Sequence, residues 1–247
     1  MRLGMKMLPI SPLETVVVTL IVVVGACIQG SIGFGWAMLS APFIVLIEPD
    51  FVPGPMILAG VLLVILMTCR ERGGIDRRGV KWMAAGSVPG VAGAAAILAV
   101  ISSTGFTIMF SILVLLAVVL SAIGLSVMLS GRNLFLAGLL SGFMGTMTSI
   151  GGPPVALIYQ HATGAKLRGT LSAFFLICAC MALVGLLVAG KLGTNELKLA
   201  LILIPGLVIG FVVSRFISGF IDRYSIRPAV LILSTIGAVM VLARALV

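Results

Sequence analysis

Two short glycine-containing motifs interrupt the apolar sequence where a continuous helix would otherwise be expected. The first reads SIGFG, from Ser31 to Gly35, and the second reads SIGGPP, from Ser149 to Pro154. Glycine lets the backbone turn and approach a ligand closely, and proline at the first position of a helix has no amide hydrogen to satisfy. Each motif therefore predicts a break in a helix, followed by the start of a new helix.

The chemistry that such breaks favour is the binding of an anion. We expect the new helices to begin at Trp36 and Pro153, and the start of a helix offers free amide hydrogens and about half a positive charge. Polar side chains beside the breaks could donate further hydrogen bonds to an oxyanion. These side chains are Gln29, Ser31, Thr146, Thr148 and Ser149. Any one of them is read more simply as bonding a helix carbonyl, but their repetition at both breaks favours a site.

We predict that the two breaks together form a substrate site. Its residues are Gln29, Ser31, Gly33, Phe34, Gly35, Trp36, Thr148, Ser149, Gly151, Gly152 and Pro153. The sequence has no acidic or basic residue in the middle of an apolar segment, so a proton relay or sodium site built on carboxylates is not supported. It also has no nucleophile triad, zinc motif or phosphate loop, so we expect no cofactor, no metal and no enzymatic activity.

The elements that carry these breaks belong to a chain with the composition of a membrane protein. Of 247 residues, 61% are hydrophobic and 9% are charged, and the mean hydropathy is +1.31. Apolar segments recur from end to end. They are roughly residues 13–47, 51–68, 82–101, 106–128, 134–160, 171–190, 199–220 and 228–247. We predict an all-α polytopic membrane protein with about eight hydrophobic segments, in which residues 1–247 form one transmembrane domain.

The net charge of +9 does not indicate a nucleic-acid partner. The basic residues lie in the links between apolar segments, where anionic headgroups and the positive-inside bias explain them. The expected surroundings are therefore membrane lipids, and formation of a homodimer stays open.

The sequence also contains an internal repeat. SIGFG at Ser31 recurs as SIGGP at Ser149, 118 residues later. VPG at Val88 recurs as IPG at Ile204, 116 residues later. We predict one repeat over about residues 13–128 and a second over about 134–247. In transporters, such a duplication places the substrate between corresponding broken segments.

The relative orientation of the repeats stays open from charge alone. Residues 13–47 would form a helix about 50 Å long, well beyond the hydrocarbon thickness. If each broken segment crosses once, the halves are parallel, and if each forms a hairpin, the halves are inverted. Both schemes put 11 of the 16 basic residues on one side. The excess length favours re-entrant first and fifth segments, so we expect inverted halves.

Several stretches resemble the TauE/SafE sulfite-exporter family of membrane transporters. They are GACIQGSIGFG near the N-terminus, GLLSGFMGTMTSIGGPP at the midpoint, and the third and seventh segments, which contain Pro-Gly. The two-fold repeat over nearly the full length is also similar. The resemblance implies a multi-pass permease of the bacterial inner membrane. Its substrate would be a small sulfur-containing anion, such as sulfite, sulfoacetate or another organosulfonate.

We therefore expect a secondary transporter that holds a small anion between the two breaks and works by alternating access. The alternative is a membrane scaffold or assembly subunit that transports nothing, in which the glycines only allow close packing. Spacings such as Gly86-xxx-Gly90 and Gly206-xxx-Gly210 are expected to be helix-packing faces in either case.

Overall fold

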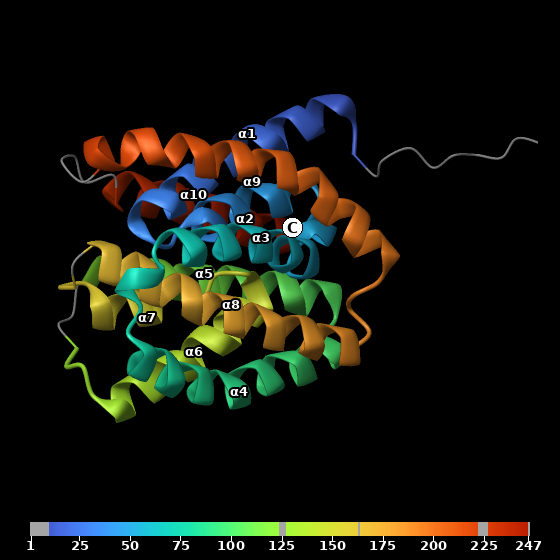
Figure 1. Ribbon diagram of the computed structural model, residues 1–247. Helices are drawn as coiled ribbons and strands as arrows, with labels where there is room; N and C mark the ends of the chain where they lie inside the picture. The colour runs from blue at the N-terminus through green and yellow to red at the C-terminus, as the bar shows by residue number, and fades with distance from the viewer. Residues whose placement is uncertain (1–9, 124–126, 163, 222–226, 247) are drawn as a thin grey trace, which may run out of the picture.

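The computed structural model describes residues 10–123, 127–162, 164–221 and 227–246, and all regular secondary structure within those ranges is helical (Figure 1). The helices are α1 (Pro12–Ile32), α2 (Trp36–Ile47), α3 (Gly54–Arg70), α4 (Arg77–Val100), α5 (Ser103–Ile123), α6 (Gly131–Thr148), α7 (Gly152–Tyr159), α8 (Gly164–Val188), α9 (Thr194–Ile221) and α10 (Arg227–Leu246). Two 3-10 turns cover Pro49–Phe51 and Arg72–Gly74.

Five of these helices are long and apolar enough to cross a membrane, namely α1, α4, α5, α8 and α9. Large apolar side chains are exposed along them, as at Leu20, Ile112 and Val184, which is expected where a helix faces lipid. The all-helical class predicted from the sequence is confirmed, and the molecule is consistent with a polytopic membrane protein.

Both expected breaks are present. α1 ends at Ile32 and α2 begins at Trp36, and between them Gly33 and Gly35 have φ angles of 101° and 119°. These angles lie in the left-handed region that favours glycine, so the local sequence explains the turn. The second break separates Thr148 at the end of α6 from Gly152 at the start of α7.

Ser149 in the second break also has a positive φ, of 65°, which a residue with a side chain adopts only when other contacts hold it. Its amide donates to the carbonyl of Gly145 at 2.8 Å, and its hydroxyl donates to the carbonyl of Pro53 at 3.1 Å. These bonds fix the turn from both sides, because Gly145 belongs to the preceding helix and Pro53 precedes α3.

The first break turns the chain back on itself. The hydroxyl of Ser40 in α2 donates to the carbonyl of Ile21 in α1 at 3.3 Å. A Cβ atom added to Gly25 would lie 2.8 Å from the carbonyl oxygen of Trp36. Residues at increasing distance from the break therefore face each other, so α1 and α2 form an antiparallel hairpin.

The second break turns in the same way. Ser141 in α6 donates its hydroxyl to the carbonyl of Gly151 at 2.5 Å, which brings the start of α7 back beside α6. Gly131 at the start of α6 packs on Trp82 near the start of α4, and Tyr159 at the end of α7 bonds Asp76 just before α4. The start of α6 and the end of α7 thus lie at the same end of the bundle.

Two close helix pairs each join a helix from the first half of the chain to a helix from the second half. α1 lies along α9, where Gly206 faces the backbone of Thr19 and Gly210 faces that of Val23. Likewise, α4 lies along α6, where Gly86 faces the carbonyl of Phe135. Both pairs run parallel, and Figure 1 shows α1 with α9 at the top and α4 with α6 at the bottom. The expected packing role of these glycines is confirmed.

The links gather at two opposite ends of the bundle. We name one the basic end. There the α3–α4 link meets the start of α8, since the amide of Asp76 donates to the hydroxyl of Thr170 at 3.0 Å. At the opposite end, Gly54 at the start of α3 packs on Lys191 in the α8–α9 link. α1 therefore runs toward the basic end, whereas α6 runs away from it.

Candidate functional site

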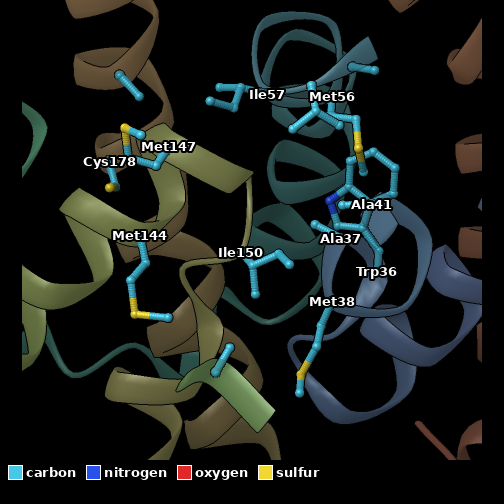
Figure 2. Close-up of a cluster of buried hydrophobic side chains, with 14 of the residues drawn as sticks. Trp36, Ala37, Met38, Ala41, Met56, Ile57, Met144, Met147, Ile150 and Cys178 are labelled. Atoms are coloured by element: carbon cyan, nitrogen blue, oxygen red, sulfur yellow. The ribbon is translucent and has the colours of Figure 1, made fainter. Parts of the chain in front are cut away.

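The two breaks line one cavity of about 90 Å³. A cavity needs roughly 10–15 Å³ by this measure to hold one water molecule, so this one has room for several waters or a small ion. Figure 2 shows part of its apolar wall, where Trp36 and Met38 of α2 lie across from Ile150 of the second break. Met56 of α3 and Cys178 of α8 also line the cavity.

The breaks touch each other directly beside this cavity. A Cβ atom added to Gly152 would lie 2.9 Å from Cδ2 and 3.0 Å from Cβ of Phe34. The side chain of the first break therefore fills the space that a side chain at the second break would need. Glycine at residue 152 is what allows this approach.

The structure brings most of the residues predicted for the site to the cavity. The lining includes Gln29, Phe34, Gly35, Trp36, Ser149, Gly151, Gly152 and Pro153. Three other predicted residues do not line it. The hydroxyls of Ser31 and Thr148 donate to carbonyls one turn earlier, at 2.8 Å and 2.7 Å, and Gly33 faces Arg168 instead.

The start of α2 offers more backbone amide donors than the start of α7 does. Its N-cap is Gly35, which has no side chain to cap the first amides. The amide of Trp36 donates to Oε1 of Gln29 at 3.3 Å, and the amides of Ala37 and Met38 follow on the same helix end. The expected beginning of this helix at Trp36 is confirmed.

The start of α7 offers fewer donors than the sequence reading assumed. The helix begins at Gly152, one residue before the expected Pro153. Its second and third residues, Pro153 and Pro154, have no amide hydrogen, so the donors at this end are the amides of Gly151 and Gly152. The helix dipole still makes this end electropositive.

Gln29 supplies a side-chain donor at the cavity. The residue is only 5% exposed, and its Oε1 atom is engaged by the Trp36 amide. The NH₂ group remains as the part of this side chain that can donate to a ligand. Ser141, which sequence reasoning did not single out, also lines the cavity, with its hydroxyl donating to Gly151.

Two arginines reach the first break from the basic end, and sequence reasoning missed them. Arg70 donates to the carbonyl of Gly30, and Arg168 donates to the carbonyl of Ser31 at 3.3 Å. Both also donate to Oε1 of Glu71, at 3.2 Å and 2.9 Å. In the sequence they stand in polar links. Their long side chains nevertheless extend back along the helices to the end of α1.

Asp76 ties α7 to the rest of the basic end. Partial burial pushes the pKa of its carboxyl group up. The amide of Gly79 and the hydroxyl of Tyr159 donate to the carboxylate, and with the nearby charge of Lys166 they lower the pKa below its ordinary value overall. The Tyr159 bond is 2.9 Å long, so a charged Asp76 anchors the last residue of α7.

The chain was also compared with known proteins. A family model described as sulfite exporter TauE/SafE matches residues 17–241, which include both breaks and both arginines at the end of α1. No curated protein and no solved structure matches the chain.

Proposed function

The chain belongs to the sulfite exporter TauE/SafE family, and from this membership we propose that it is a secondary transporter of a small sulfur-containing anion. Sulfite, sulfoacetate and other organosulfonates are the proposed substrates. Transport proceeds by alternating access. The proposed location is the bacterial inner membrane.

The observation that best supports this proposal is the meeting of the two breaks at one cavity. Irregular backbone at membrane depth is tolerated only where protein or a water-filled cavity surrounds it. A break whose glycines served packing alone would not require an opposing break and a shared cavity. The cavity therefore favours a transporter over a scaffold.

The arrangement of donors and apolar side chains suits an anion with a small organic part. The amides at the start of α2, the NH₂ group of Gln29 and the amide of Gly152 would hold the charged oxygens. Trp36, Met56 and Phe175 line the remaining wall. Apolar walls with a few placed polar groups are the usual construction of a small-molecule site.

We propose that the halves, about residues 13–128 and 134–247, are inverted repeats. α1 and α6 would correspond and run in opposite directions, as would α4 and α9. The parallel pairs α1 with α9 and α4 with α6 would then be equivalent. Superposing the halves is expected to place Gly33 on Gly151 and Pro89 on Pro205. The hairpin scheme assigns 11 of the 16 basic residues in the sequence to one side, and on that ground we propose that the basic end is cytoplasmic.

The direct test is flux of labelled sulfite, sulfoacetate and other sulfonates in proteoliposomes. The parent protein should give saturable flux with at least one of these anions. Gly152→Val should abolish that flux, because the new side chain would press on Phe34 and fill the meeting point of the breaks. Gly93→Val is the matched control, since a Cβ atom added to this helical glycine would lie no closer than 4.0 Å to any atom beyond its own stretch of helix.

The two variants also separate transport from a scaffold role. In a transporter, Gly152→Val is monodisperse and inactive while Gly93→Val keeps parental flux. If the parent protein neither binds nor transports any of these anions, that result would favour the alternative function of a membrane scaffold. Parental flux in a well-folded Gly152→Val protein would show that the cavity between the breaks is not on the path.

A further inference from the structure

A second cavity, of about 190 Å³, lies beside the end of α1 at the basic end. Its lining residues are Gly30, Arg70, Glu71, Arg168 and Arg215. We name it the arginine vestibule. The family membership and the central cavity give this second space no role.

The vestibule has more positive than negative charge. Three guanidinium groups face one carboxylate, and the side chains of Arg70, Arg168 and Glu71 are only 23%, 19% and 13% exposed. Like charges in a partly buried space repel one another more strongly than in water. An anion in the vestibule would relieve that repulsion.

The protein uses only part of the donor capacity of these arginines. A guanidinium has five N–H donors. Arg70 makes hydrogen bonds to Glu71, to the hydroxyl of Ser214 at 3.2 Å and to Gly30, and Arg168 makes bonds to Glu71 and Ser31. Within the residues that the structure describes, Arg215 has no hydrogen bond or ion pair. The vestibule therefore holds N–H donors that the protein leaves to a ligand or to water.

Part of this cluster has a structural explanation. Arg70 and Arg168 bond the last carbonyls of α1, and a cation at the C-terminal end of a helix stabilises it. That explanation accounts for the contacts with Gly30 and Ser31. It accounts neither for Arg215 nor for the open space between the three side chains.

The vestibule and the central cavity lie on the two sides of the first break. A Cβ atom added to Gly33 would lie 3.3 Å from Cα of Arg168, whereas the next residue, Phe34, lines the central cavity. Gly30 faces the vestibule and its neighbour Gln29 faces the central cavity. An anion that moves between the basic end and the centre would thus pass the arginines and then the turn at Phe34.

We propose that the arginine vestibule is a second anion-binding site, in which a small oxyanion such as sulfite is held by Arg215 together with Arg70 and Arg168 before or after it occupies the central cavity. Guanidinium groups match oxyanions through paired, charge-assisted hydrogen bonds. This inference rests on the proposed transport of a small anion. It adds to that proposal the place at the basic end where the anion binds, namely the arginine vestibule.

The test is equilibrium binding of labelled sulfite to the full-length purified protein, with stoichiometry and affinity measured at fixed low ionic strength. The parent should bind two equivalents. Gly152→Val should keep only the vestibule site, and Arg215→Gln should keep the central site. At the vestibule, Arg215→Gln should weaken binding by about tenfold or more, because it removes hydrogen bonds to a charged ligand.

Arg132→Gln is the matched control. Arg132 is an exposed arginine near the start of α6 and does not line the vestibule, so its loss changes the overall charge equally. It should leave both sites intact. Arg215 is exposed and bonds no described residue, so Arg215→Gln is expected to fold as the parent does.

The outcomes separate this inference from the proposed function. If Arg215→Gln binds sulfite as Arg132→Gln does, or if Gly152→Val binds none while the parent does, the vestibule is not a site. If Gly152→Val binds as the parent does and Arg215→Gln binds none, the vestibule stands and the central site fails. A parent protein that binds no sulfite at all contradicts the vestibule site, whereas the proposed function is contradicted only if sulfoacetate and the other sulfonates also show no saturable flux.

Discussion

Gln29 is the residue on which the proposed anion site depends most at the level of single side chains. It is buried beside the first break, and its two polar ends have different tasks. The carbonyl end accepts the Trp36 amide and so steadies the start of α2, and the NH₂ end can donate to a ligand. A polar amide in an apolar segment costs little only if both ends are used.

Replacing Gln29 by glutamate should strongly weaken anion binding while preserving the fold. The carboxylate has nearly the same shape and can still accept the Trp36 amide, but it loses both donors and adds a like charge at the site. We expect the affinity for sulfite to fall on the order of a hundredfold or more. Equilibrium binding, with the melting temperature measured in parallel, checks this expectation.

Gln29→Met serves as the control for this substitution, because it removes the donors without adding charge. It should weaken binding by about tenfold. If Gln29→Glu bound sulfite as tightly as the parent, this side chain would not contact the anion.

Single hydroxyl side chains show where prediction from sequence stops. Ser31 and Thr148 flank the breaks as expected, but both bond the carbonyl one turn earlier. Ser141 lines the cavity although it stands eight residues before Ser149. Whether a hydroxyl faces a cavity or its own helix depends on how the helix is rotated against its neighbours, and sequence does not give that rotation.

At the scale of elements, the breaks themselves follow from local chemistry. Gly33 and Gly35 adopt left-handed angles, and Pro153 stands within the first turn of α7, so the sequence alone locates both turns. The direction of the chain after each turn could not be predicted from charge, because the basic residues divide equally well under a crossing and a hairpin, and only the excess length of residues 13–47 favoured the hairpin. Contacts such as Ser40 with Ile21 settle that direction.

The attachment of α7 at the basic end should depend on pH. The pKa of Asp76 is lowered in the folded protein. The charged carboxylate therefore contributes stability above its ordinary value of 3.8, and this contribution is lost as the pH falls through the lower folded value. The melting temperature of the parent should decline below about pH 4, and that of Asp76→Asn should decline less.

Thermal unfolding in detergent between pH 3 and pH 7 measures this difference. Asp76→Asn keeps a side chain that can cap α4, so it isolates the charge from the cap. Asp50→Asn, which changes an exposed carboxylate at the opposite end, is the control and should follow the parent. Parallel pH profiles for all three proteins would contradict the role given to Asp76.

In the whole molecule, the main helices of one half of the chain pack against helices of the other half. Gly86 and Gly206 were expected to mark packing faces, but the sequence could not say which helix each would meet. The structure pairs α4 with α6 and α9 with α1. Partner choice depends on the global path of the chain, which local spacing of small residues does not encode.

The proposed inversion predicts which links are accessible from which side of the membrane. In a background without the four native cysteines, Gly73→Cys would mark the basic end and Lys191→Cys the opposite end. A Cβ atom added to Gly73 would meet no atom within 4 Å beyond its chain neighbours, and Lys191 is exposed. An impermeant maleimide should label Lys191→Cys in intact cells and Gly73→Cys only after the membrane is opened. Labelling of both from the same side would contradict the hairpin topology.

The central claim is that a small anion is held where the two breaks meet. The most direct measurement is the location of bound selenite, a heavier analogue of sulfite, by anomalous scattering at the selenium edge. We predict a peak in the cavity between Gly35–Trp36 and Gly151–Gly152, within hydrogen-bonding distance of Gln29 and the first amides of α2. Selenite that binds only elsewhere, or no bound selenite at a saturating concentration, would contradict the claim.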